Sequence, residues 1–342
     1  MWRTFERDTA DELWSDVVNV LQQAGADVHQ QAGRGGATRE ILHVGLTLRD
    51  PRQRWAIIRR PALNPAFALA EVVWIVTGRR DARFLSYFNR KLAKFAGSAP
   101  ELHGAYGYRL RQQFGVDQLE AAYDTLRNNP NSRQVVLQIW DSREDLPKKD
   151  GSPRDDDIPC NTQSYLKIRD GRLEWMQMMR SNDVFLGLPH NLVQFTALQE
   201  IMAGWLGIQV GVYHHLSDSL HIYVEDIARI AVAPMATLPA ARSIALPKAE
   251  SDQAFAELAR IVTFIVDHEN DASVLLRLAD AADLPSTYRD IARVLIAEGL
   301  RRRQQVEQAA GLMSRCQDEI FRLLWSNWIN RLSPRESSTP MD

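Results

Sequence analysis

Chemically reactive side chains gather in the middle third of the chain, beginning with Cys160. This thiol follows Ile158-Pro159 and precedes a segment that reads as a strand. A cysteine in a loop near cations has a lowered pKa, and its thiolate can add to an electron-poor carbon. Addition to C6 of a pyrimidine turns C5, a poor nucleophile, into an enolate carbon that can attack an electrophile. Cys160 is a candidate for this role. A lone cysteine is more often a small, buried, unreactive side chain, so the residues around Cys160 carry the prediction.

The groups that would hold a nucleotide follow this cysteine in the sequence. Arg180 and Ser181 offer a planar guanidinium and a short hydroxyl, which together suit a phosphate. Asn191 can donate to a uracil O4 and accept from N3–H at once. His221 and Tyr223 alternate along an expected strand, so both face one side and could share a sugar hydroxyl. Each has an ordinary alternative: a surface arginine, a helix N-cap at Asn191, and strand residues without a ligand.

Two upstream features also attract attention. Gly33-Arg34-Gly35-Gly36 is a glycine-rich turn that would let the backbone approach a ligand, or that forms the end of a flexible hairpin. Glu71 stands alone in an apolar helical pattern, and a buried carboxylate is costly without a partner or a task. Glu71 is therefore a candidate functional acid.

Composition and charge are those of an ordinary globular protein. The net charge gives no positive potential that would attract a polyanion. The 342 residues are 45% hydrophobic and 25% charged, with a formal net charge of −2, which argues against nucleic acid or a membrane as partner. The two cysteines, Cys160 and Cys316, offer neither a disulfide framework nor metal-ligand spacing. The segment from Met1 to Asp8 lacks the apolar core of a signal peptide, and no apolar run reaches membrane-spanning length. We therefore expect a cytoplasmic protein without a metal.

Hydrophobic spacing predicts an α+β architecture up to about residue 245. The expected elements are helices over residues 9–24, 64–77 and 192–206, strands over 134–140, 165–168, 173–176 and 220–224, and a solvated loop over 141–157. The strand over 134–140 reads as buried, Asp170-Gly171 as a hairpin turn, and Gly207 as the end of a helix.

From about residue 250 the pattern becomes purely helical and continues beyond Leu323. We expect a catalytic domain at residues 1–245, a helical C-terminal extension at 246–332 and a disordered tail at 333–342.

The order and spacing of these motifs resemble the thymidylate synthase superfamily over roughly residues 15–226. The resemblance implies that family's mixed sheet packed with helices, followed here by the helical extension. The roles that it implies are the nucleophile for Cys160, proton transfers through a water network for Glu71, ordering of the active site for Tyr106, phosphate binding for Arg34, Arg133, Arg180 and Ser181, base reading for Asn191, sugar contacts for His221 and Tyr223, and folate binding for Asp183 and Gly187.

Three departures from the family pattern bear on the product. Asn161 stands beside the thiol where thymidylate synthases usually carry histidine, and we include it among the catalytic residues. No tryptophan occurs between Trp74 and Trp140, so the indole that normally lies against the folate is missing. The helical extension replaces the family's short C-terminal closing segment.

Two motifs look closer to the nucleotide hydroxymethylase branch of the superfamily. They are Arg180-Ser181-Asn182-Asp183 and the Ser-Asp-x-x-His pattern that ends at His221. Members of that branch typically read cytosine with an aspartate at the position of Asn191. This chain therefore resembles a uracil-type member of the branch.

The resemblance implies one-carbon transfer from 5,10-methylenetetrahydrofolate to C5 of a uracil nucleoside 5′-monophosphate, with dUMP expected, through a Cys160–C6 adduct. Hydride as the last nucleophile gives a methyl group, whereas water gives a hydroxymethyl group. We favour hydroxymethylation because the missing indole and the altered C-terminus admit water. A true thymidylate synthase is the first alternative. An inactive nucleotide-binding module is the remote one, and the joint presence of Cys160, Glu71 and Asp183 argues against it.

The resemblance also implies a homodimer. Arg133, beside Ser132 at the entry to a strand, corresponds to the arginine that crosses to the partner's phosphate, and symmetric dimers are the commonest oligomers.

Overall fold

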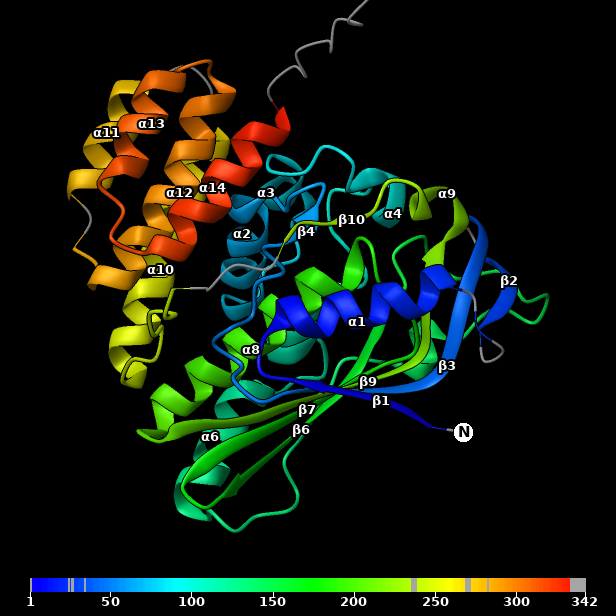
Figure 1. The fold of residues 1–342 in the computed structure, drawn as a ribbon. Helices are drawn as coiled ribbons and strands as arrows, with labels where there is room; N and C mark the ends of the chain where they lie inside the picture. Colours follow the sequence, from blue (N-terminus) through cyan, green and yellow to red (C-terminus); the bar gives the residue numbers. More distant parts are fainter. Residues whose placement is uncertain are drawn as a thin grey trace, which may run out of the picture.

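A mixed β-sheet carries helices packed against one of its faces (Figure 1). The computed structural model describes residues 2–23, 25, 28–33, 35–234, 239–267, 272–281 and 283–332. In Figure 1, α1 (Ala10–Gln23) and α8 (Gly187–Leu206) lie over the sheet, and the C-terminal helices stand beside α2 (Pro65–Val76). The predicted α+β class is confirmed.

The strands come from the whole length of the N-terminal two thirds of the chain. They are β1 (Arg3–Arg7), β2 (His29–Gly33), β3 (Gly36–Leu48), β5 (Val136–Gln138), β6 (Asn161–Arg169), β7 (Arg172–Met179), β8 (Asn182–Asp183) and β9 (Gln209–Tyr223). Their order is β1-β3-β9-β7-β6-β5, with β2 beside β3 and β8 beside β9. β9 runs antiparallel to β3 and parallel to β7. Two short strands, β4 (Arg59–Arg60) and β10 (Ala231–Val232), pair with each other apart from this sheet.

The faces of the sheet differ in burial. Along β7 the side chains of Leu173, Trp175 and Gln177 are fully buried, whereas those of Met176 and Met178, on the opposite face, are half-buried. The pattern repeats along β9. Because side chains alternate across a strand, one face is covered by helices and the other is open.

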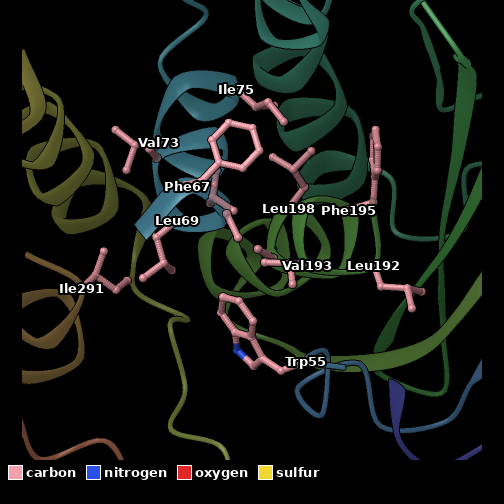
Figure 2. Packing of buried hydrophobic residues seen from close by; sticks show 14 of the residues in the cluster. Trp55, Phe67, Leu69, Val73, Ile75, Leu192, Val193, Phe195, Leu198 and Ile291 are labelled. Carbon is pink, nitrogen blue, oxygen red and sulfur yellow. The ribbon is translucent and has the colours of Figure 1, made fainter. Parts of the chain in front are cut away.

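α2 and α8 form the apolar centre beneath the covered face (Figure 2). α2 begins where predicted: the Asn64 side chain accepts from the N–H groups of Ala66 and Phe67, and Pro65 occupies the first helical position. Figure 2 shows side chains of both helices, among them Leu198, in one cluster. Helices packed this tightly hold their polar residues in fixed positions.

The turns predicted from glycine and aspartate are confirmed. Asp170 and Gly171 both have positive φ, 50° and 69°, as a two-residue hairpin turn requires. Gly207, with φ 68° and ψ 27°, ends α8 in the left-handed conformation.

Three sequence predictions need correction. The strand at 134–140 is shorter and lies at the edge of the sheet, so Val136 is 43% exposed and only one face of β5 is covered. α8 begins at Gly187, so Asn191 lies inside its first turns and is not an N-cap. The loop at 141–157 is not fully solvated, because it contains α7 (Ser142–Asp145) and buries Asp145.

The purely helical character of the C-terminal region is confirmed. Its helices are α10 (Lys248–Asp267), α11 (Ala272–Ala281), α12 (Ser286–Arg302), α13 (Val306–Ser314) and α14 (Glu319–Leu332). Buried Glu200 of α8 anchors the segment that leads into α10. It pairs with Arg54 and accepts from Ser243 Oγ at 2.8 Å and from the N–H of Ile244 at 3.1 Å. The domain limits at 245 and 332 stay predictions, and residues 333–342 lie outside the described residues. None of the described helices is long and apolar enough to cross a membrane.

Short helices connect α2 to β5, the edge strand of the sheet. They are α3 (Ala82–Ser86), α4 (Ala93–Ala96), α5 (Tyr106–Tyr108), the π-helical turn η1 (Arg109–Gln113) and α6 (Gln118–Asn128); α9 (Val224–Ile227) follows β9.

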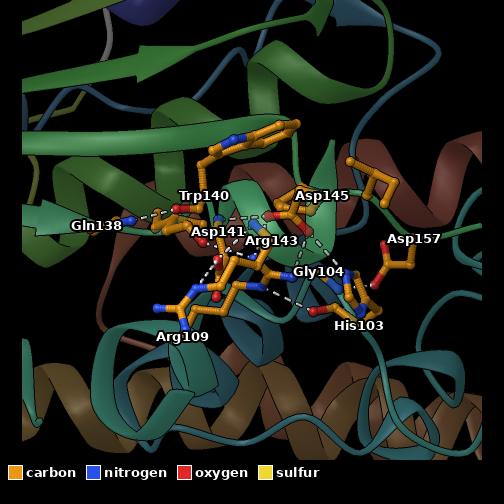
Figure 3. Close-up of polar contacts among 12 residues, drawn as sticks. His103, Gly104, Arg109, Gln138, Trp140, Asp141, Arg143, Asp145 and Asp157 are labelled. Carbon is orange, nitrogen blue, oxygen red and sulfur yellow. Dashed lines mark hydrogen bonds and ion pairs between the residues drawn. The ribbon is translucent and has the colours of Figure 1, made fainter. Parts of the chain in front are cut away.

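A buried ion pair joins these connections (Figure 3). Arg109 Nη1 and Nη2 donate to the two carboxylate oxygens of Asp145 at 2.6 and 2.9 Å, and both side chains are almost fully buried. His103 Nε2 lies 2.9 Å from the same carboxylate, which also accepts from the N–H of Asp141 at 2.8 Å. Burial raises the pKa of Asp145, but the bonds from Arg109, Asp141 and His103 outweigh it and lower the pKa below its usual value. The carboxylate therefore stays charged and fully paired.

Removing the cation from this pair should destabilise the fold. In Arg109→Met the chain loses its charge but keeps most of its volume, so Asp145 becomes a buried unpaired charge, which costs about 3–5 kcal/mol. Urea unfolding measures the loss. Arg143→Met is the matched control, because the Arg143 side chain is 90% exposed, and its effect should stay within about 0.5 kcal/mol. Equal losses in both variants would contradict the assignment.

Candidate active site

Cys160 lies at the end of the loop that enters β6, with its side chain partly exposed. Arg180, which directly follows β7, wraps this loop: its Nε donates to the carbonyl of Pro159 at 2.9 Å and its Nη2 to that of Ile158 at 3.1 Å. The same Nη2 lies 3.9 Å from Cys160 Sγ. Positive charge beside the sulfur is the environment of a reactive thiolate.

Tyr106 of α5 belongs to the same cluster. Burial raises the pKa of its phenol, the negative charges of Cys160, Asp157 and Glu71 raise it further, and the Asn161 amide opposes them. The phenol therefore stays neutral and can donate or accept a hydrogen bond. The structure thus brings together four residues that the sequence assigned to catalysis.

The direction of the Asn161 amide is fixed by a chain of buried partners. The Trp175 indole, which only donates, lies 3.4 Å from Gln177 Oε1, and this oxygen also accepts from Ser164 Oγ at 2.5 Å. Gln177 Nε2 therefore faces Asn161 Oδ1, at 2.9 Å. Asn161 Nδ2 is left buried near the Tyr106 phenol, without a hydrogen bond of ordinary geometry to any described residue. A fully buried, unsatisfied N–H group marks a place for a ligand or a water.

Glu71 has the partner that its burial required. His190 Nδ1 donates to Glu71 Oε2 at 2.8 Å, so α2 and α8 are joined at this point. The sequence analysis did not assign His190 a role, although it stands within the Gly187–Asn191 motif. The sequence feature that indicated a buried partner was Glu71 itself, the lone acid in an apolar helix.

Asn191 is held by a second chain of partners. Its Nδ2 donates to Asn182 Oδ1 at 3.2 Å, and Asn182 Nδ2 lies 2.9 Å from His215 Nε2. His215 Nδ1 is 3.0 Å from Tyr213 Oη. Burial lowers the pKa of His215 to about 3, so its ring is neutral and Nε2 accepts. Nothing in the sequence pattern pointed to Asn182 or His215 as supports.

Gly187 is needed where it stands. A Cβ at this position would lie 3.0 Å from Asn182 Oδ1 and would crowd the amide that holds Asn191. This steric constraint is separate from the predicted folate contact of Gly187, which stays a prediction.

Asp183 lies on β8, in register with His221 of β9. Its Oδ1 accepts from the N–H of Phe185 at 2.8 Å and its Oδ2 from that of Leu186 at 3.3 Å. Burial raises the pKa of Asp183 to about 6 in spite of these bonds. Ser181 directly precedes β8, half-buried.

His221 and Tyr223 lie side by side as the strand alternation predicted. Their rings meet edge to face with centroids 5.5 Å apart, and burial lowers the pKa of His221. The glycine-rich turn packs here, because a Cβ on Gly35 would lie 3.0 Å from the Tyr223 ring. Arg34 itself lies outside the described residues.

Arg133 stands apart from these groups. It is exposed just before β5, at the sheet edge, and makes no hydrogen bond or ion pair with any described residue. A hollow of about 410 Å³ is lined by Gln138, Trp140, Thr162, Gln163 and Arg180. The lining of a larger hollow of about 600 Å³ includes Arg83, Tyr87 and Arg302 and none of the predicted site residues. We therefore place the candidate site at Cys160 on chemical grounds.

The described ranges contain no group of acids, histidines and cysteines that could hold a metal ion.

The fold and this site define an α+β protein whose candidate nucleophile is a loop cysteine beside an arginine. A family model described as thymidylate synthase matches residues 13–266, so the chain belongs to the thymidylate synthase family.

Relatives of both reaction types match the chain. The deoxyuridylate hydroxymethyltransferase of Bacillus phage SP01 is 33% identical over 234 residues, which are 65% of this chain and 59% of that protein. The protein of the same name from Pseudomonas phage M6 is 36% identical over 179 residues, 52% of this chain and 49% of that protein. A putative thymidylate synthase of Methanothermobacter thermautotrophicus is 30% identical over 213 residues, 61% of this chain and 88% of that protein. The chain thus spans only about half of the length of the phage relatives.

The raised pKa of Asp183 predicts a pH dependence. If its carboxylate accepts from the N–H donors of a folate pterin, binding needs the ionised form, which is lost as pH falls through about 6. The kcat/KM for methylenetetrahydrofolate should therefore fall below about pH 6. In Asp183→Asn this acid limb should be absent. An unchanged limb in the variant would assign the titration to another group.

Proposed function

We propose that the protein transfers a one-carbon unit from 5,10-methylenetetrahydrofolate to C5 of a uracil nucleoside 5′-monophosphate, dUMP, and releases the 5-hydroxymethyl nucleotide and tetrahydrofolate. The observation that carries the proposal is Cys160 beside Arg180, with the unsatisfied Asn161 N–H in the same cluster. The two phage relatives of the chain, which carry the name deoxyuridylate hydroxymethyltransferase, support the same reaction. A cytoplasmic location stays a prediction.

In this proposal Cys160 adds to C6 of the pyrimidine and C5 attacks the folate's methylene carbon. Asn191 reads the base. Because Asn182 occupies one of its N–H groups, the other N–H and Oδ1 are left to face O4 and N3–H of uracil. Arg180 and Ser181 bind the phosphate, His221 and Tyr223 the sugar.

Water then completes the reaction. After the folate leaves, the nucleotide carries an exocyclic methylene, which hydride converts to methyl and water to hydroxymethyl. The Trp74 indole cannot shield this group, because it is 4% exposed and donates to the carbonyl of Asp81 at 3.2 Å. No tryptophan follows until Trp140. In the proposal, Asn161 Nδ2, which is buried without a hydrogen-bond partner among the described residues, holds a water in the cluster that contains Glu71 and Tyr106.

Mass analysis of the nucleotide formed from dUMP and methylenetetrahydrofolate tests the proposal. We expect 5-hydroxymethyl-dUMP and tetrahydrofolate. Cys160→Ser should lower turnover by at least about a hundredfold while nucleotide binding persists, because covalent activation and ground-state binding use different residues. Stoichiometric dihydrofolate with dTMP would instead identify a thymidylate synthase, and binding without turnover in the unaltered protein would identify an inactive nucleotide-binding module.

A homodimer accounts for Arg133 and for the open face of the sheet. Half-buried Met176, Met178 and Tyr165 lie on that face, which a second copy could cover. Arg133 at the sheet edge would then reach the phosphate in the partner's site.

Mixing inactive subunits tests this arrangement. Arg133→Ala and Cys160→Ala each remove one part of a shared site, so exchanged heterodimers should regain one intact site. About a quarter of the unaltered activity is expected when exchange is random and equal. Arg143→Ala mixed with Cys160→Ala is the control for dilution. No recovery after verified subunit exchange would contradict the shared site.

A further inference from the structure

The contact between His190 and Glu71 gives the acid a fixed direction. His190 Nδ1 holds Glu71 Oε2 at 2.8 Å. The other oxygen, Oε1, has no hydrogen bond to any residue that the structure describes, yet it is not among the atoms sealed from solvent. One oxygen is therefore anchored and the other is open to a water.

The His190 ring is itself held in place. It packs edge to face on Phe67, with centroids 5.0 Å apart and planes at 62°. Both helices that carry the pair lie in the apolar core, and the side chains of His190 and Glu71 are only 16% and 15% exposed. A carboxylate supported from rigid helices keeps its orientation more closely than one on a loop.

We propose that His190 is a positioning residue that turns Glu71 Oε1 toward the water that attacks the exocyclic methylene. This rests on the proposed function. The water oxygen bonds to the methylene carbon as one water proton passes to Glu71. The electron pair of the methylene double bond moves into the ring as an enolate. Its return re-forms C5=C6 as the bond from C6 to Cys160 breaks, and nothing is oxidised or reduced.

Two variants separate the donor from the packing. His190→Phe keeps a ring against Phe67 but removes the hydrogen bond to Glu71. His190→Asn keeps a donor near the position of Nδ1. If His190→Phe does not fold, His190→Leu takes its place, with thermal unfolding as the measure of folding.

Single-turnover measurements separate the steps. Release of tritium from 5-tritiated dUMP reports the loss of the C5 proton, which precedes the attack by water. In His190→Phe we expect tritium release close to that of the unaltered protein and hydroxymethyl formation slower by about 10- to 100-fold. The KM for dUMP should stay within about threefold. His190→Asn should regain most of the lost rate.

A double-mutant cycle tests that His190 acts through Glu71. In a Glu71→Gln background, His190→Phe should cause no further loss. Additive losses, equal slowing of both steps, or failure of His190→Asn to recover more than His190→Phe would overturn the positioning role. The unaltered protein reports separately on the proposed function: without tritium release that function fails, and dTMP as product corrects the reaction.

Discussion

The buried pair of Arg109 and Asp145 is the constraint on which the geometry of the candidate site depends. A buried charge must be paired on every side, and this carboxylate collects its partners from segments far apart in the sequence. Arg109 also donates to the carbonyls of His103 and Ile139 at 3.0 and 2.9 Å. These bonds fix both ends of the segment that carries Tyr106. The N–H of Gly104, within it, donates to Asp157 at 2.8 Å and so joins the loop that leads to Cys160.

Buried partners determine the orientation of the asparagine amides in the candidate site as well as their position. An asparagine amide can turn over and exchange donor for acceptor, so its neighbours decide which group faces the cleft. For Asn161 the deciding neighbour is the Trp175 indole, acting through Gln177. For Asn191 it is a neutral His215, acting through Asn182. Groups aligned in this way need no rearrangement when a ligand arrives.

The same reasoning links the structure to the choice between water and hydride. A reactive methylene survives until hydride arrives only where water is excluded. Here an indole that could exclude water is turned into the core at Trp74, while Asn161 Nδ2 and Glu71 Oε1 are left without protein partners in the described part of the chain. Both are groups that hold water. The proposed hydroxymethyl product rests on these two groups, because both can hold a water near the reactive methylene.

The sequence alone determined the fold class, the elements with strong periodicity and the identity of the chemical groups. The sequence predicts α2 and α8 because both are long apolar stretches whose side chains are buried on nearly every side, which is a local property. The turns at Gly171 and Gly207 follow from backbone sterics. Tertiary structure decided what depends on partners distant in sequence. It made β5 an edge strand, placed Asn191 within a helix, and joined Glu71 to His190, 119 residues away. Such contacts arise only when sheet and helices pack, because hydrogen bonds between buried side chains have no sequence period.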